Sequence, residues 1–379
     1  MKKNPLHTKT YFENLDSLRF LAALTVVISH CQINFNYVFS NKVLQILHLH
    51  FFKNGSLGVN FFFVLSGFLI SWLLLMEKEK RNTVDLINFY KRRVLRIWPV
   101  YFIVVIIGFY IGSTCDFPFI TNQNFNYRSD LTQVKWYVTF LANYAPGNSN
   151  FLISQLWSVS VEEQFYFFWP ILFLFVNKKQ FLYCCFLIVI ISFIYKIYDM
   201  QRVSTYVSTP FVMSDLAFGG LICYYAMYHQ AFFSSIKNLS KKSIYAIYIV
   251  LICYTFLHGF SHIFGEKIFL LYSPFESILF AILFSLVILE QNFSDNSFYK
   301  FGKINLFNRL GKISYGIYAY HMLTFPIAFY IASLLPFNDL GLLSYLIKTF
   351  TVIICTICIS LFSYHFIEVK FLSLKNKSF

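Results

Sequence analysis

The chain alternates between long apolar runs and short polar stretches, and this pattern predicts its secondary structure. Ten runs approach the roughly twenty residues with which an α-helix crosses a bilayer. The runs are too long and too uniformly apolar for barrel strands, and backbone groups in lipid must be satisfied within the structure, so helices are expected. The expected spans cover residues 18–38, 57–76, 97–113, 157–176, 181–198, 209–228, 244–260, 268–290, 313–334 and 343–367. The pattern thus predicts an all-α, polytopic integral membrane protein.

Charge along the chain predicts the orientation of these spans. An even number of spans puts both termini on one side of the membrane. If that side is the cytoplasm, the inner connections contain most of the lysines and arginines, including those in residues 78–81 and 91–96, whereas the outer connections contain few. This is the usual positive-inside distribution. We therefore expect a multi-pass protein of the cell inner or plasma membrane with both termini in the cytoplasm.

Composition agrees with a membrane protein and narrows its partners. Of the 379 residues, 58% are hydrophobic, 21% are aromatic and only 13% are charged, which lies outside the range of soluble domains. The net charge of +14 follows from the expected topology, so membrane lipids are expected as partners and nucleic acid is not. The eight cysteines fall mainly inside apolar segments, where they behave as small buried hydrophobes, and no disulfide framework or metal site is expected.

One membrane domain is expected over residues 1–371, because the chain shows no internal repeat and no soluble domain. Residues 114–156 form a long outer loop, in which an amphipathic piece over 131–141 is too short to span and predicts an interfacial helix. A loop of this length has a binding function or serves as a structural cap. Residues 372–379 form a short basic cytoplasmic tail. The first span lacks a signal-peptide cleavage site and is expected to be retained.

Polar residues inside the apolar runs mark the candidate site. Arg19 and His30 lie eleven positions apart in the first span, so on a helix they lie within about 20° of one face and are separated by roughly 16 Å. Ionisable side chains inside a span are costly and usually face the bundle interior or a watery cavity. The pair therefore indicates one wall of a polar cavity. A snorkelling arginine with a histidine bonded to a carbonyl is the alternative.

Small residues and basic residues follow along the chain. In the second span, Gly58, Ser66 and Gly67 permit close helix approach and Ser66 adds a hydroxyl, so helix packing and ligand binding are both open.

Arg93 and Arg96 lie three positions apart, which places them on one helix face, and a guanidinium pair suits phosphate recognition. A positive-inside anchor or a contact with anionic lipid is the alternative for this basic run.

Two carboxylates lie near the start of the fourth span. Glu162 and Glu163 have no opposite charge within helical reach, so at least one should face a cavity. By its expected depth, Glu162 meets His30 across the bundle. A carboxylate bonded to one imidazole nitrogen raises the basicity of the other, which suits a general base for a hydroxyl nucleophile. A buried polar pair that only fixes helix packing is the alternative. Tyr166 follows on the same helix.

The last polar cluster opens the ninth span. Residues 311–321 contain Tyr315 and His321, and the tenth span ends at residues 364–368 with a histidine and a glutamate. His321 is expected in the inner half of the membrane, where a histidine bridges helices more often than it catalyses.

Together these clusters resemble the acyltransferase-3 family of integral membrane proteins, whose members transfer acyl groups to sugars and other hydroxyls outside the cytoplasm. The matching pieces are Arg19 with ten intervening residues before His30, GVNFFFVLSGFL, KRRVLRIWPVY, LWSVSVEEQFYFFWP and GKISYGIYAYHML. Each piece is weak by itself, but five in order with the same topology form a specific signal over nearly the whole chain.

The resemblance implies roles for individual residues. The family's acidic residue in the fourth span matches Glu162 best, with Glu163 as the second choice. The family's near-terminal motif of glutamate, arginine or lysine, and proline is replaced by Glu368-Val369-Lys370-Phe371, which weakens any role for Glu368. The expected site consists of the catalytic residues His30 and Glu162, the donor-binding residues Arg19, Arg93, Arg96, Ser66 and Gly67, and the supporting residues Glu163, Tyr166, Tyr315 and His321, without a metal.

The expected function is that of an O-acyltransferase, specifically an O-acetyltransferase. About ten helices would enclose a polar catalytic cavity, in which an acyl group passes from cytoplasmic acyl-CoA to a hydroxyl of a cell-surface glycan or lipid-linked saccharide. Acyl-CoA, above all acetyl-CoA, is then a donor substrate, and no permanently bound cofactor is expected. His30 would remove the hydroxyl proton with Glu162 orienting its ring, and an acyl-histidine relay is also open.

A transporter is the alternative from a different class. It would move an activated or lipid-linked saccharide or a small solute, with the arginines and Glu162 as substrate and proton-relay sites. The missing internal repeat argues mildly against it.

Overall fold

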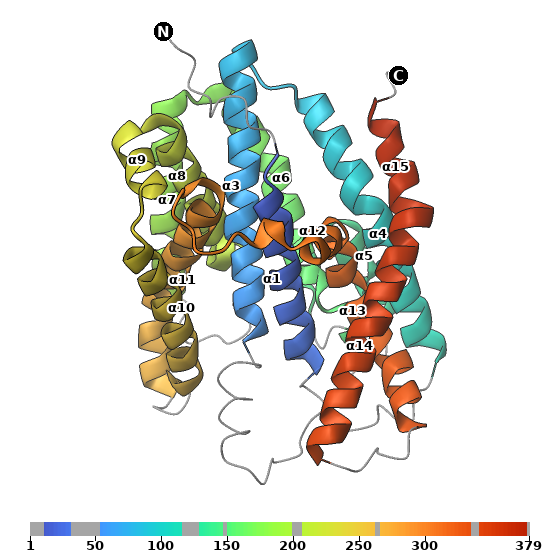
Figure 1. Ribbon diagram of the computed structural model, residues 1–379. Helices are drawn as coiled ribbons and strands as arrows, with labels where there is room; N and C mark the ends of the chain where they lie inside the picture. The colour runs from blue at the N-terminus through green and yellow to red at the C-terminus, as the bar shows by residue number, and fades with distance from the viewer. Residues whose placement is uncertain are drawn as a thin grey trace. The chain divides into compact units, whose positions relative to one another are not determined.

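The computed structural model describes residues 11–31, 54–115, 129–146, 150–198, 207–261, 266–334 and 341–376, and the regular elements within them are all helical (Figure 1). The long helices are α1 (Glu13–Cys31), α3 (Gly55–Arg81), α4 (Leu86–Thr114), α6 (Leu156–Phe175), α7 (Lys178–Tyr198), α8 (Thr209–Tyr228), α10 (Lys241–Ser261), α11 (Glu266–Phe293), α13 (Ser314–Ser333) and α14 (Gly341–Ser363). The shorter helices are α5 (Val134–Val138), α9 (Gln230–Lys237), α12 (Asn305–Lys312) and α15 (Val369–Ser373).

The prediction of an all-α, polytopic membrane protein is confirmed, and each predicted span contains a helix. By length and hydropathy, six of the described helical segments can cross a membrane, and α9 with α10, bent by 88°, adds a seventh. Helices α1, α6 and α13 are not among them, because they contain the polar residues of the candidate site. A total of ten spans therefore stays a prediction. The expected end of the first span, residues 32–38, lies outside the described residues.

The chain divides into two compact units whose segments alternate along the sequence. Unit 1 comprises Met1–Ala22, Ser56–Leu86 and Phe167–Gly311, and unit 2 comprises Ala23–Gly55, Ile87–Tyr166 and Lys312–Phe379. Helices α1 and α6 each contribute residues to both units. A single domain over residues 1–371 stays a prediction.

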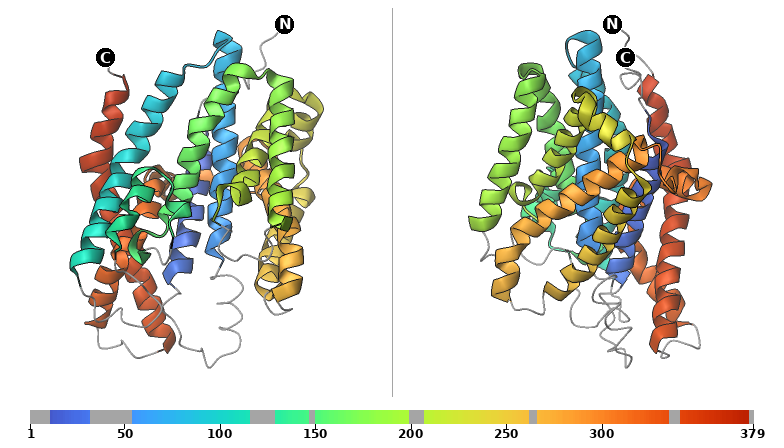
Figure 2. Two further views of the ribbon diagram at one scale, coloured as in Figure 1. Left: turned by 180° about the vertical axis from the view of Figure 1, so that it is seen from behind. Right: turned by 60° about the vertical axis from the view of Figure 1, so that its left-hand side comes forward.

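Unit 1 is built around helices α7, α8 and α11. Helix α7 packs against α8, and α11 packs against α8, α9 and α10 (Figure 2). The opposite face of α7 is apolar and exposed, with Leu187, Ile190 and Ile194 each more than half accessible. A large exposed apolar face is what a helix presents to lipid.

The core of unit 1 joins the beginning of α1 to α3 and α11. Phe12, Phe68, Trp72 and Phe293 are buried and form one aromatic cluster, with ring centroids 5.3 to 6.4 Å apart. Ring pairs at such separations stabilise a core beyond their buried area. The cluster therefore fixes Phe12, the residue directly before α1, against α3 and α11.

Two glycines allow α3 and α8 to touch along their backbones. A Cβ atom added at Gly67 would collide with the carbonyl oxygen of Leu216, and one added at Gly219 would collide with the carbonyl oxygen of Val64. Small residues at membrane-helix contacts let backbones approach closely. Close packing between these two helices thus requires glycine at both positions.

Unit 2 contains the pair α13 and α14, which pack side by side. Helix α14 continues through one π-helical turn, η9 (Tyr364–Glu368), into α15, so that the three form one long rod (Figures 1 and 2). Single π turns inside α-helices often lie at functional sites. This turn contains the buried side chain of Glu368.

The connection between α4 and α6 in unit 2 packs against α4. Helix α5 and the preceding 3-10 turn, η4 (Leu131–Gln133), lie within the predicted helix over 131–141. Tyr101 donates a hydrogen bond to the carbonyl oxygen of Tyr137 at 2.8 Å, and Asn150 donates one to the carbonyl oxygen of Gly108 at 2.9 Å. Residues 116–128 and 147–149 lie outside the described residues, and an interfacial position for α5 stays a prediction.

Candidate active site

His30 of α1 and His321 of α13 lie in contact within unit 2. Nδ1 of His30 is 3.2 Å from Nε2 of His321 and 3.0 Å from the carbonyl oxygen of Val26. His321 is completely buried, and its Nδ1 lies 2.6 Å from the carbonyl oxygen of Tyr318. His30 is half-buried. The two imidazoles therefore form one hydrogen-bonded chain.

The partners in this chain assign the protons of both rings. A carbonyl oxygen only accepts, so Nδ1 of His321 donates to Tyr318, and Nε2 of the neutral His321 ring is an acceptor. Both neighbours of His30 Nδ1 are then acceptors, which assigns the proton of neutral His30 to Nδ1. Nε2 of His30 keeps its lone pair. That atom has the chemistry of a general base.

Contacts between α6 and α13 hold His321 in place. The hydroxyl oxygens of Ser158 and Tyr318 lie 2.5 Å apart, and Gln155 donates from Nε2 to the carbonyl oxygen of Ala319 at 2.6 Å. These bonds fix Tyr318 and Ala319, which precede His321 by three and two residues. The start of α6, one of the motifs singled out in the sequence, thus positions the histidine pair through α13.

A second polar group in unit 2 involves Glu163, which faces α4. Its Oε2 accepts a hydrogen bond from Trp98 Nε1 at 2.8 Å, and its Oε1 is buried without a hydrogen-bond partner among the described residues. Arg93 interacts electrostatically with Glu163, and its guanidinium lies over the Tyr166 ring, 5.3 Å from the centroid. Three residues that were singled out separately in the sequence are therefore neighbours.

Tyr315 extends this group to α13. Its hydroxyl donates to the carbonyl oxygen of Ile97 in α4 at 3.0 Å. Its phenol interacts electrostatically with the carboxylates of Glu162, Glu163 and Glu368. We call Arg93, Arg96, Glu162, Glu163, Tyr315 and Glu368 the carboxylate–arginine cluster.

Among these residues, Glu368 has the weakest support from sequence motifs. It is 5% exposed, lies beside Gly316 of α13 and interacts electrostatically with Arg96. The departure of its surroundings from the family motif argued against a role. Its position in the sequence did indicate a polar partner, because a carboxylate at the end of an apolar span is costly unless it meets a charge or a polar cavity.

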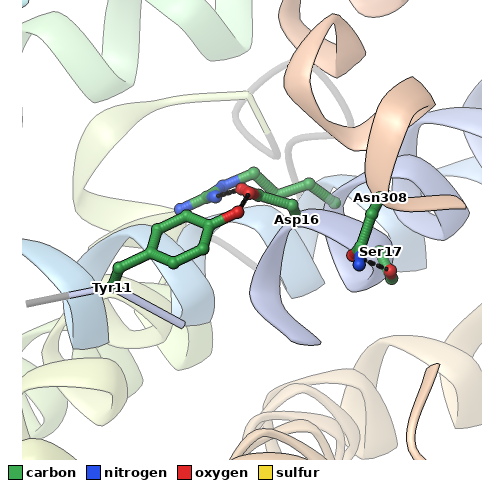
Figure 3. Close-up of polar contacts among 5 residues, drawn as sticks. Tyr11, Asp16, Ser17 and Asn308 are labelled. Atoms are coloured by element: carbon green, nitrogen blue, oxygen red, sulfur yellow. Dashed lines mark hydrogen bonds and ion pairs between the residues drawn. The ribbon is translucent and has the colours of Figure 1, made fainter. Parts of the chain in front are cut away.

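Arg19 belongs to unit 1 and lies near the beginning of α1. Its Nη1 is 2.6 Å from Oδ1 of Asp16, and Oδ2 of Asp16 accepts from the Tyr11 hydroxyl at 2.7 Å (Figure 3). Partial burial and the bond to Asp16 raise the pKa of Tyr11 to about 12, so the phenol stays protonated and donates. Ser17 donates to Asn308 Oδ1 at 2.6 Å. The guanidinium is therefore held by a carboxylate that is itself fixed.

The remaining expected donor-binding residues, Ser66 and Gly67, also lie in unit 1. Gly67 occupies the close crossing of α3 and α8, which is the packing interpretation that the sequence left open. Ser66 is half-buried on the same helix. A donor-binding role for these two residues stays a prediction.

The partner of His30 differs from the one expected. Among the described residues, its hydrogen-bond partners are Val26 and His321, and the sequence had suggested Glu162. Equal depth along two helices does not determine which way each side chain points, and that is why the pairing was misplaced.

Among the described residues, no group of three histidine, cysteine, aspartate or glutamate side chains is placed to hold a metal ion.

The comparisons with known proteins agree on one family. Residues 12–365 match the family model described as an acyltransferase domain. The O-acetyltransferase OatA of Staphylococcus aureus is 27% identical over 379 residues, covering 96% of this chain and 57% of that protein. The peptidoglycan O-acetyltransferase OatA of Listeria monocytogenes is 33% identical over 178 residues, covering 45% of this chain and 25% of that protein.

This chain thus spans less than two thirds of the length of these relatives. A putative O-acetyltransferase of Staphylococcus aureus is 30% identical over 168 residues, covering 43% of this chain and 24% of that protein. No solved structure gives a significant match. With the family model matching nearly its whole length, the chain belongs to the acyltransferase-3 family of membrane O-acyltransferases.

Proposed function

We propose that this protein is a membrane O-acetyltransferase that transfers an acetyl group from cytoplasmic acetyl-CoA to a hydroxyl of a cell-envelope glycan or its lipid-linked precursor. The family supports the reaction class, and the printed names of the relatives make peptidoglycan the first acceptor to test. The observation that carries the proposal is the histidine pair, in which His30 keeps its proton on Nδ1 and offers Nε2 as a base.

His30 acts on the acceptor hydroxyl. Nε2 of His30 removes the proton as the hydroxyl oxygen attacks the thioester carbonyl carbon, and the imidazolium then returns that proton to the departing sulfur of CoA. The products are the acetyl ester and free CoA, so atoms and charge balance. His321 is a positioning residue, because it accepts the Nδ1 proton of His30 in a hydrogen bond and so fixes the ring.

The arginines bind the donor. Arg93 and Arg96 lie on one helix, and guanidinium groups match phosphate geometry better than ammonium groups do. Arg19, held by Asp16, adds a third guanidinium on the helix that contains His30. The helical rise from Arg19 to His30 is roughly 16 Å, of the order of an extended pantetheine arm. Ser66 and Gly67 are assigned to donor binding as well, and a catalytic role for Glu162, with Glu163 as the second choice, stays a prediction.

The topology completes the proposal. About ten spans surround a polar catalytic cavity, both termini lie in the cytoplasm, and residues 114–156 face outward. The strongly basic connections near residues 78–96 and 237–242 support this orientation through the positive-inside bias.

The reaction is tested with purified protein in lipid vesicles. Acetyl-CoA labelled in the acetyl group is mixed with soluble peptidoglycan fragments, and alkali-labile label on the saccharide is measured. We expect transfer that requires both substrates. Movement of the fragments across the vesicle membrane without acetyl transfer would instead support the transporter interpretation.

A further inference from the structure

Among the ionisable residues of unit 1 that the proposed reaction does not use, four lie on the neighbouring helices α7, α8, α10 and α11 and are buried or largely buried. Lys196 of α7, Asp215 of α8 and Glu276 of α11 are 3%, 1% and 4% exposed, and the side chain of His258 in α10 is 14% exposed. We call these four residues the α7–α11 charge cluster. Ionisable residues inside membrane spans are costly and usually mark a site for a ligand or an ion.

The two halves of this cluster differ. His258 and Glu276 form a closed pair, with Nδ1 of the histidine 2.7 Å from Oε1 of the glutamate. Lys196 instead donates to the hydroxyls of Ser214 and Ser277, at 2.9 and 2.7 Å. These serines adjoin Asp215 and Glu276 in the sequence, so the ammonium group lies between the two carboxylate-bearing helices.

The Lys196–Asp215 half leaves one donor and one acceptor for a ligand. An ammonium group has three donors, and two are used on the serines. Oδ1 of Asp215 has no hydrogen-bond partner among the described residues, although Asp215 interacts electrostatically with Lys196. A buried acceptor without a partner costs about 1–3 kcal/mol. A hydroxyl group satisfies both, because it donates to a carboxylate and accepts from an ammonium group.

We infer that Asp215 and Lys196 bind a hydroxyl of a saccharide, and that the saccharide is the acetyl acceptor. The identification of the saccharide as acceptor rests on the proposed function. In the proposed topology, α7 and α10 run outward and α8 and α11 run inward, which puts all four cluster residues toward the outer side, where an envelope glycan arrives. The ring of Phe211, 5.1 Å from Lys196 Nζ, provides an apolar wall beside the charge.

The test compares Asp215→Asn, the double variant Lys196→Met with Asp215→Asn, and the control Glu290→Gln. The double variant removes both charges and so leaves neither buried by itself. Glu290 is a fully buried carboxylate at the other end of α11, where its Oε2 accepts from Tyr248 and Gln291 at 2.8 Å. Equilibrium binding of a soluble peptidoglycan disaccharide peptide and the KM values for that fragment and for acetyl-CoA are measured, with thermal unfolding as the check on folding.

We expect Asp215→Asn and the double variant to weaken fragment binding and raise the fragment KM by about ten- to a hundredfold, as loss of a hydrogen bond to a charged group does. The acetyl-CoA KM should stay within about twofold, and Glu290→Gln should leave both KM values unchanged. A folded double variant that binds the fragment like the wild type overturns the inference. If the wild type binds the fragment through Asp215 but transfers no acetyl group, the proposed function fails and the saccharide site stands.

Discussion

His30 can accept a proton at Nε2 only while its Nδ1 holds the other one. In this protein the acceptors that keep the proton on Nδ1 are a backbone carbonyl and a second neutral imidazole. A carboxylate in that place would raise the basicity of His30 further, but it would have to be buried beside an apolar segment. The neutral partner orients the ring without that cost.

The role of His321 is tested by replacing it with glutamine and with phenylalanine. Glutamine can offer a side-chain carbonyl to Nδ1 of His30, whereas phenylalanine offers no acceptor. We expect His321→Phe to lower kcat by more than about tenfold with an unchanged acetyl-CoA KM, and His321→Gln to recover part of the loss. Equal losses in both folded variants would reduce His321 to a packing residue.

The donor arginines give a second prediction at this scale. Arg93→Ala and Arg96→Ala should raise the acetyl-CoA KM several-fold to about a hundredfold with a smaller change in kcat, because contacts remote from the thioester supply binding. Arg92→Ala is the matched control, since Arg92 is an exposed arginine on the same helix. Steady-state kinetics decide whether these arginines bind the donor or only anchor the helix at the membrane surface. Poor membrane insertion of both variants, with normal kinetics in the fraction that inserts, would favour the anchor interpretation.

At the scale of elements, close contacts between helices limit which side chains the sequence can contain. Helices α3 and α8 meet through Gly67 and Gly219, where an added Cβ atom meets backbone. At Gly220, one residue further along α8, an added Cβ atom would meet side-chain atoms of Cys185, Trp169 and Phe181 at 3.0 to 3.3 Å. A side chain can shift by itself, whereas relief of a clash with backbone requires one whole helix to move away from the other.

This difference predicts an order of stability. Gly219→Ala should destabilise the protein by about 1–3 kcal/mol, the usual cost of overpacking, and Gly220→Ala should cost less. Thermal unfolding in detergent, followed by loss of the helical signal, measures both. The packing explanation for Gly219 fails if Gly219→Ala unfolds at the same temperature as the wild type or as Gly220→Ala.

The helices were predictable from the sequence because the length of an apolar run determines where a span lies. Their ends were less predictable: α3 extends to Arg81 and α4 begins at Leu86, since charged residues continue a helix into water beyond the apolar run. Side-chain pairing was the least predictable. Arg93, Glu163 and Tyr166 were expected in one site and lie together, whereas the rotation that turns His30 toward His321 depends on packing between distant segments.

At the scale of the whole molecule, charge asymmetry predicts which side of the membrane each connection faces. Lys135 of α5 and Lys241 of α10 are both exposed, so cysteines in their places leave the core unchanged. In a background without the native cysteines, Lys135→Cys should react with an impermeant thiol reagent added outside intact cells, and Lys241→Cys should react only after the membrane is opened. Labelling of Lys241→Cys from outside would refute the proposed orientation.

The candidate residues are divided between the two units. Unit 2 contains the histidine pair and the carboxylate–arginine cluster, and unit 1 contains Arg19, Ser66, Gly67 and the α7–α11 charge cluster. Helix α1 joins them covalently, because Arg19 lies in its first part and His30 in its second. The base of the proposed reaction therefore belongs to unit 2, and the residues of the proposed saccharide contact belong to unit 1.

The most direct test of the proposed reaction is the rate of acetyl transfer in His30→Gln, measured in single turnover with saturating acetyl-CoA and peptidoglycan fragments. Glutamine is polar and similar in length but cannot act as a base at neutral pH. A positioned base contributes about a hundred- to ten-thousandfold, so the rate should fall by that factor while acetyl-CoA binding is retained. A rate within a few-fold of the wild type in the folded variant would contradict the assignment of His30 as the base.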